Sequence, residues 1–123
     1  MLKDSKAFSG YSVDDVDVAK DFYGDKLGLE VTESEAGLGL NLATGGEVFI
    51  YPKENHEPAS FTVLNFPVDD LEGTVDSLTE KGVSFERYEA FDQDERGIAQ
   101  PEMGPPIAWF KDPAGNVLSL MAA

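Results

Sequence analysis

The chain has 123 residues, of which 24 are acidic and 9 are basic, so its formal net charge is −15. This length predicts one domain with a sizeable core, and the charge argues against nucleic acids and anionic membrane surfaces as partners. The lack of cysteine excludes disulfides and thiolate chemistry, while the lack of a long apolar run or a signal segment predicts a cytoplasmic protein with no membrane partner.

The first half of the chain predicts a strand, a helix and three further strands. Asp14 and Asp15 can cap a helix whose apolar residues recur at helical spacing, and Gly28 suits the left-handed position that ends such a helix. Alternating apolar residues mark the strands. The predicted strands are residues 7–13, 29–34, 38–42 and 47–52, and the predicted helix is residues 16–27.

The second half repeats this order after residues 53–59, which have no periodicity and are predicted to be a linker. Val13-Asp14-Asp15-Val16 recurs as Val68-Asp69-Asp70-Leu71, which indicates an internal repeat. The second copy is predicted to contain strands at residues 60–68 and 83–88, a helix from Leu71 to Gly82, a long loop at residues 89–106 and a final hairpin at residues 107–122.

The final hairpin carries a clear turn signal. Asp112-Pro113-Ala114-Gly115 has Asp first, Pro second and Gly fourth, which are the residues that a type I turn favours. Both faces of the strand after the turn are nearly apolar, so we expect it to be covered on both sides or to line a cavity. Ser119 is the one polar side chain in the middle of that strand.

Two stretches resemble a known family. FKDPAGNVLSL, residues 110–120, resembles the ending F-x-D-P-x-G-N-x-x-E-L of the vicinal oxygen chelate superfamily, which includes glyoxalase I, extradiol dioxygenases, fosfomycin-resistance enzymes and bleomycin-binding proteins. SVDDVDVAKDFYGDKLGLEV, residues 12–31, resembles that family's first helix and flanking strands. The resemblance implies an α+β fold in which residues 1–123 form a single domain of two βαβββ modules, at about 6–52 and 60–122. Their strands would form a curved eight-stranded mixed sheet with a concave cup, and the protein would be a homodimer.

In metal-using members of this family, four strands each place one ligand in the cup. Carried over through the aspartate before each helix, these positions fall on Phe8, Ile50, Val63 and Ser119, the last of which stands where those members have Glu. None is a usual strong ligand, and a shift of one residue brings in no better donor. We therefore expect no metal and no other cofactor.

Other chemistries find little support in the sequence. A Ser-His-Asp triad would need His56, the only histidine, to reach Ser12 or Ser119, whereas an exposed linker histidine is the simpler expectation. The aspartates before each helix are expected to be caps. The loop carboxylates of Asp92, Asp94 and Glu95 are expected to be solvated rather than to bind a cation.

What remains is an apolar, aromatic cup, in which Trp109 is the strongest signal of a ligand site. The loop at residues 89–106 enters just before the strand that carries Trp109, so it is expected to gate the cup. An alternative is that these side chains fill the cup as ordinary core. The predicted ligand-binding residues are Phe8, Ser12, Ile50, Val63, Asn65, Met103, Ile107, Trp109, Ser119 and Met121.

The sequence thus favours a metal-independent relative of the bleomycin-binding proteins, with a small hydrophobic or cationic aromatic molecule bound in the cup. One alternative is a divergent glyoxalase- or dioxygenase-like enzyme with an altered site that uses His56 or loop carboxylates. Another is an interaction domain with a filled cup. The acidity fits either a solvated surface or the attraction of a cationic ligand.

Overall fold

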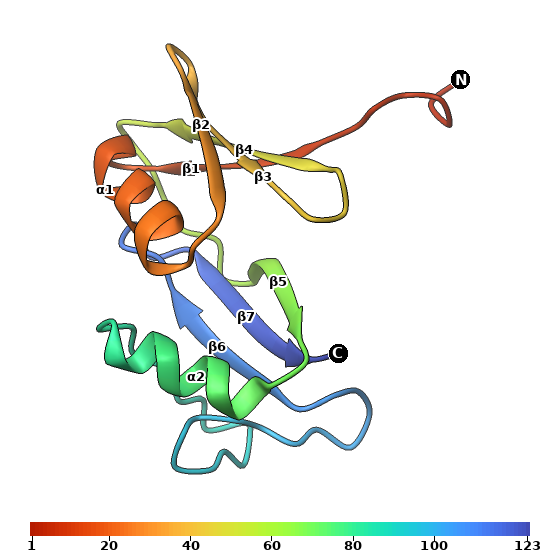
Figure 1. Ribbon diagram of the computed structural model, residues 1–123, viewed down its shortest axis with the longest axis vertical. Helices are drawn as coiled ribbons and strands as arrows, with labels where there is room; N and C mark the ends of the chain where they lie inside the picture. The colour runs from red at the N-terminus through yellow and green to blue at the C-terminus, as the bar shows by residue number, and fades with distance from the viewer. The chain divides into compact units, whose positions relative to one another are not determined.

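The computed structural model describes all 123 residues, which divide into two compact units, Met1–Glu57 and Pro58–Ala123 (Figure 1). Each unit has a sheet with a helix packed against it. The first unit contains β1 (Ser9–Val13), α1 (Val16–Asp21), η1 (Phe22–Lys26), β2 (Glu30–Ser34), β3 (Gly37–Asn41) and β4 (Glu47–Pro52). The second contains β5 (Thr62–Val68), α2 (Leu71–Glu80), β6 (Ile107–Lys111) and β7 (Val117–Ala122).

Aspartate caps begin both helices, as predicted. The Asp15 carboxylate accepts hydrogen bonds from the backbone N–H groups of Asp17 and Val18, and the Asp70 carboxylate accepts one from Gly73. The predicted helix at residues 16–27 is an α-helix that continues into the single π-helical turn η1. Gly28 follows this turn with φ 72°, a conformation in which a side chain would clash.

The first sheet has the strand order β1-β4-β3-β2, with β1 parallel to β4 and the other pairs antiparallel. One face packs under the helical segment, where the Tyr11 hydroxyl donates to the Tyr23 hydroxyl at 2.8 Å. Ile50 and Leu38 are in register with Tyr11 and are fully buried on this face. The opposite, open face carries Ser12, because side chains alternate along a strand.

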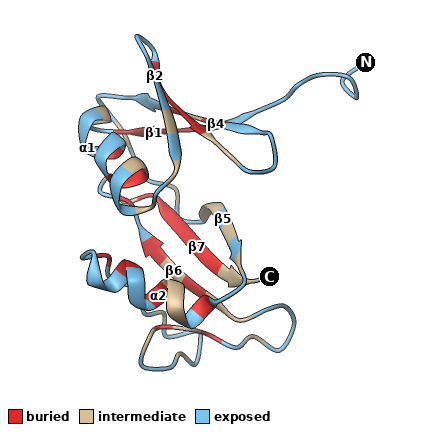
Figure 2. Cartoon of the chain, in the orientation of Figure 1, coloured by how far each residue is buried: buried red, intermediate tan, exposed pale blue.

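The second sheet has the order β5-β7-β6, with β5 parallel to β7 and β6 antiparallel to it. Helix α2 buries Leu71, Val75 and Leu78. Phe110 and Leu118 are fully buried in register with each other, and β7 is buried along most of its length (Figure 2). The alternate residues of β6 and β7 form the open face of this sheet.

The structure contains seven strands rather than the predicted eight. Residues 83–88 make only one bridge, between Phe85 and Phe110, followed by a hydrogen bond from the Glu86 N–H to the Trp109 carbonyl at 2.8 Å. Beyond this point the Gln93 side chain takes the backbone groups that a strand would use, since it donates to the Glu86 carbonyl and accepts from the Tyr88 N–H. A side chain therefore ends the ladder that the sequence pattern predicts.

The predicted type I turn joins β6 to β7. The Asp112 carbonyl accepts from the Gly115 N–H at 3.0 Å, and the Asp112 carboxylate accepts from the Asn116 N–H at 2.8 Å. Gly115 has φ 90°, so glycine is required there. No helix of the structure is both long and apolar enough to cross a membrane.

Candidate functional site

The open face of the second sheet places three predicted site residues side by side. Trp109 on β6 is in register with Ser119 on β7, which is in register with Asn65 on β5. The Ser119 hydroxyl is fully buried and donates to the Asn65 side-chain oxygen at 2.5 Å. Because the Ser119 hydroxyl donates its proton to Asn65, these two side chains form a structural polar pair. The pair lies beside Trp109 in the sheet.

Two rings from outside the sheet stand against Trp109. The Tyr88 ring meets it edge-on, with centroids 5.4 Å apart and planes at 74°, and the Phe91 ring lies tilted against it, with centroids 4.8 Å apart. Aromatic pairs favour such offset and edge-to-face arrangements. The sequence pattern predicts neither ring, because Tyr88 and Phe91 lie at the start of the long loop, where no periodicity exists.

These rings line a recess of about 240 Å³ within the second unit. Its wall is largely carbon, with hydroxyl groups from serine, threonine and tyrosine, which is the composition of sites for organic ligands. Phe61 is 68% exposed and Phe91 is 42% exposed, so the recess opens to solvent. The lining residues are Ser60, Phe61, Thr62, Tyr88, Phe91, Trp109 and Val117.

The Tyr88 hydroxyl is held in its neutral form. Partial burial raises the pKa of Tyr88, and the neighbouring Glu86 carboxylate raises it further, while Lys111 opposes the shift. Lys111 itself lies 3.5 Å from Glu86. Tyr88 is therefore available to donate one hydrogen bond to a ligand at ordinary pH.

The open face of the first sheet is more exposed. The Phe49 and Tyr51 rings stack with centroids 5.8 Å apart and planes at 20°, and Phe8 is 68% exposed. A recess of about 580 Å³ lies at Phe8 and Phe49, and its other lining residues are Lys6, Ala7, Gly45, Gly46 and Glu47. No ring from a neighbouring loop stands over these side chains as Phe91 stands over Trp109.

His56 corrects one expectation. It is half-buried rather than exposed, and its Nδ1 lies 2.6 Å from the Ser12 hydroxyl oxygen. The backbone N–H of His56 also donates to the Lys53 carbonyl at 3.1 Å, which folds the linker back toward β1. The sequence contains no local signal for this contact, because the two residues are separated by 44 positions.

The ten predicted site residues do not all share one face. Asn65, Ile107, Trp109, Ser119 and Met121 lie on the open face of the second sheet, with Val63 next to them at a strand irregularity. Phe8 and Ser12 belong to the first unit, where Ser12 lies on the open face of β1 and Phe8, just before the strand, lines the recess at Phe49. Ile50 points the other way, into the helix-covered core, so Phe49 and Tyr51 occupy the open face in its place. Met103 is 91% exposed on its loop.

The residues present do not fit the divalent metal that metal-using relatives hold. The structure brings together no group of three or more His, Cys, Asp or Glu side chains that could bind one. At the position of the relatives' carboxylate, Ser119 donates its hydroxyl proton to Asn65. Phe8, Ile50 and Val63 offer only carbon, so the hard oxygen or imidazole donors that such ions need are missing from the whole set.

A sequence model of the Glyoxalase/Bleomycin resistance protein/Dioxygenase superfamily matches residues 8–120. The chain belongs to this superfamily. Members of the superfamily and related proteins of known structure share its fold, whereas a comparison with curated proteins found no match.

A superfamily member from Sphaerobacter thermophilus DSM 20745 aligns over the full length of both chains, with a TM-score of 0.76 and 20% identity. The genomically encoded fosfomycin resistance protein FosX of Listeria monocytogenes has a TM-score of 0.72 and 12% identity, with 95% of this chain and 91% of FosX covered. TnmS3, an antibiotic binding protein from Streptomyces sp. CB03234, has a TM-score of 0.69 and 22% identity, with 94% and 92% covered. At these identities the likeness establishes the fold.

Proposed function

We propose that this protein is a metal-independent superfamily member that binds a small hydrophobic or cationic aromatic molecule against Trp109. The observation that carries the proposal is the recess formed by Trp109, Tyr88 and Phe91, beside ligand positions occupied by side chains that metals do not favour. TnmS3, an antibiotic binding protein, has the same fold, so this fold can serve a binding role of the proposed kind.

The recess favours a flat ligand with limited polarity. An aromatic face such as that of Trp109 attracts a stacked ring or a cation, and a desolvated contact of this kind contributes about 2 kcal/mol, or roughly thirtyfold in affinity. At about 240 Å³ the recess is smaller than the sites that enclose drug-sized ligands, so it would hold one ring system of a larger molecule. The net charge of −15 would speed the arrival of a cation, in a salt-dependent way.

A fluorescence screen tests this proposal, because Trp109 is the only tryptophan. Planar cationic compounds should quench its emission saturably, and calorimetry should show that Trp109→Phe keeps part of the affinity while Trp109→Ala loses it. The proposal fails if no compound in a broad library changes the emission and Trp109→Ala also unfolds the protein, since Trp109 is then core.

Metal independence has its own test. Elemental analysis of gently purified protein should find no stoichiometric transition metal, because the carried-over positions lack carboxylate and imidazole groups. One zinc, nickel, manganese or iron per chain that disappears in Ser119→Ala would contradict the proposal.

We also propose that the protein is a homodimer. Edge strands such as β2 and β5 leave backbone groups unpaired, and Phe8 and Phe61 expose large apolar surfaces, which association would cover. Light scattering should give a mass near twice the 13.3 kDa of one chain. A monomer mass at micromolar concentration would refute this part.

The contact between Ser12 and His56 favours a second candidate, an enzyme with His56 as its base. In such a reaction the Ser12 oxygen would bond to the carbonyl carbon of an ester as its proton passes to His56 Nδ1, which lies 2.6 Å away. The alcohol would leave with that proton, and water would then release the acid from Ser12. A fluorophosphonate probe distinguishes the two functions. Labelling that disappears in Ser12→Ala would support the enzyme, and a lack of labelling would leave the binding function.

A further inference from the structure

We propose that Arg96 and Gln93 are positioning residues that hold Phe91 against Trp109, so that an ion pair on helix α2 sets the shape of the recess. Its effect on affinity rests on the proposed binding function, but its effect on the Trp109 environment does not. Phe91 lies in the segment 86–98, which begins where the Glu86 N–H donates to the Trp109 carbonyl on β6 and contains the Arg96 contact with α2. Each end of this segment is fixed by side-chain contacts.

Gln93 ties the two ends of the segment together. Its Nε2 donates to the carbonyls of Glu86, at 2.9 Å, and Gly97, at 2.7 Å, while its Oε1 accepts from the Tyr88 N–H at 2.7 Å. The Phe91 N–H donates to the Tyr88 carbonyl at 3.0 Å, so the chain turns tightly at the ring. One amide side chain thus closes the loop that projects Phe91.

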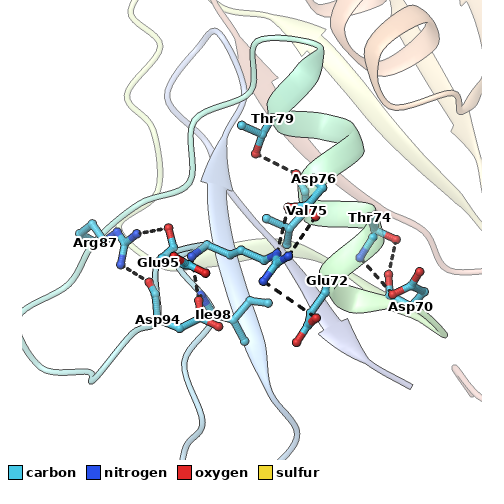
Figure 3. A network of polar contacts seen from close by, with 12 residues as sticks. Asp70, Glu72, Thr74, Val75, Asp76, Thr79, Arg87, Asp94, Glu95 and Ile98 are labelled. Carbon is cyan, nitrogen blue, oxygen red and sulfur yellow. Dashed lines mark hydrogen bonds and ion pairs between the residues drawn. The ribbon is translucent and has the colours of Figure 1, made fainter.

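The far side of the loop is also internally bonded (Figure 3). The Asp94 carboxylate accepts from the N–H groups of Arg96 and Ile98, each at 2.9 Å. The Arg87 guanidinium donates to the carbonyls of Asp94 and Glu95. These contacts make residues 86–98 a compact unit, which backbone hydrogen bonds between Ala99 and Ile107 join to β6. A further contact that fixes this unit therefore also affects the position of Phe91.

Arg96 is the anchor, and its partners lie on α2. Its Nε and Nη2 donate to the two carboxylate oxygens of Asp76, at 2.9 and 3.2 Å, and Nη1 lies 3.9 Å from Glu72. Figure 3 labels the two acidic partners, Asp76 and Glu72. This paired geometry fixes direction as well as distance, which lysine cannot do. The hydrogen bond to Asp76 and the negative charge of Asp76 raise the pKa of Arg96, so the Arg96 guanidinium is positively charged in the folded protein.

The anchor is open to solvent and therefore adjustable. The side chains of Arg96 and Asp76 are 33% and 53% exposed, so dissolved salt screens their attraction. Loss of the ion pair would leave the Phe91 segment held by Gln93, by Arg87 and by the backbone hydrogen bonds that join Ala99 to Ile107 of β6. Phe91 would then spend part of its time away from Trp109, and the recess would widen.

The experiment compares Arg96→Gln with Lys20→Gln, which removes one positive charge from an exposed ion pair with Glu33 in the first unit. The collisional quenching of Trp109 by acrylamide, a neutral quencher, should increase about twofold in Arg96→Gln, as expected for local opening, and stay unchanged in Lys20→Gln. Arg96→Lys should behave like Arg96→Gln, because it keeps the charge but not the paired bonds.

A second arm uses the dye N-methylacridinium as ligand. Its affinity should fall about fivefold in Arg96→Gln, which corresponds to the partial loss of an aromatic contact, and remain at the wild-type value in Lys20→Gln. If the variant does not fold, wild-type protein in rising sodium chloride takes its place, and acrylamide quenching should increase as the ion pair is screened.

The results of these experiments distinguish the positioning role from the proposed binding function. Quenching that stays at the wild-type value in both Arg96 variants and in high salt overturns the positioning role, whether or not the dye binds. Quenching that increases in protein to which neither the dye nor any library compound binds sustains the positioning role and overturns the binding function.

Discussion

The open faces of the two units are built alike and covered differently. Each carries aromatic rings beside a buried serine that contacts a second polar side chain, His56 in the first unit and Asn65 in the second. In the first unit the strands β2 and β3 join by a two-residue turn, the Phe49 ring is half-buried and the Tyr51 ring remains exposed. In the second the corresponding connection is the long segment after residue 88.

This difference shows what the insertion adds to the repeat. The first unit also has a recess, of about 580 Å³ at Phe8 and Phe49, but its stacked rings stand on a single strand. The recess of the second unit is lined by rings from a strand and from the inserted segment. The second unit therefore has a recess at Trp109 because the inserted segment returns to the sheet with Phe91. Substitutions at matched places in the two units test this difference.

The largest difference is expected between Trp109→Ala and Tyr51→Ala. Trp109 is half-buried between two rings, so its loss should lower the free energy of unfolding by about 2 kcal/mol and abolish ligand binding. Tyr51 is 36% exposed with one stacked partner, so its loss should cost about 1 kcal/mol or less and leave binding intact. Urea unfolding followed by circular dichroism measures the free energy of unfolding of both variants, and calorimetry measures their ligand binding. Equal losses in the two variants would show that the two faces are equivalent.

A second pair of variants tests the inserted loop through its backbone. Gly97 and Gly45 both have φ 91°, but a Cβ on Gly97 would lie 3.1 Å from the Phe85 Cβ, whereas a Cβ on Gly45 would meet nothing within 4 Å. Gly45→Ala should cost about 1 kcal/mol from strain alone, and Gly97→Ala about 2 kcal/mol because crowding is added.

The emission maximum of Trp109 gives an independent readout for the same pair. Gly97→Ala should shift it to longer wavelength, because Gly97 accepts a hydrogen bond from Gln93 and its displacement would loosen the segment that holds Phe91. Gly45→Ala should leave the emission unchanged. A shift in both variants would mean that Trp109 responds to global stability rather than to the loop.

The smallest expected effect is the pH dependence from Tyr88. Its pKa is raised in the folded protein, so the folded state holds the phenolic proton more tightly than the unfolded state does. The resulting stability is fully present below about pH 10, where unfolded tyrosine titrates, and is lost as the pH rises through the folded pKa. Urea unfolding at alkaline pH should show a shallower decline in Tyr88→Phe than in the wild-type protein. An identical decline would remove this contribution.

Local patterns predicted the elements of this fold because they arise from local physics. The caps at Asp15 and Asp70, the turn at Asp112 and the alternation of the strands each depend on neighbours within a few residues. The family resemblance then predicted two modules with the same order of strands and helix. The match over residues 8–120 confirms the superfamily.

The predictions that failed depend on side-chain contacts that follow no periodic pattern, or on the phase of a strand. The strand at residues 83–88 is lost because a side chain five positions beyond Tyr88 takes its hydrogen bonds. Ile50 was placed one residue out of phase, which moves a side chain to the opposite face of a sheet. The walls at Tyr88 and Phe91 lie where no periodicity exists, so only the ring contacts reveal them.

The strand orders also imply a sequence of events during synthesis. In the first unit β2, β3 and β4 form a local antiparallel meander that β1, already made, can join once residue 52 has emerged. In the second, β7 is the central strand and neither β5 nor β6 has a partner strand without it, so both must wait until residue 122 is made. Non-local pairing of this kind is slow, so we expect the first unit to be structured on the ribosome while the second still exposes its apolar strands. A nascent chain stalled near residue 115 should therefore show protease resistance in its first half alone, because β7 is not yet complete.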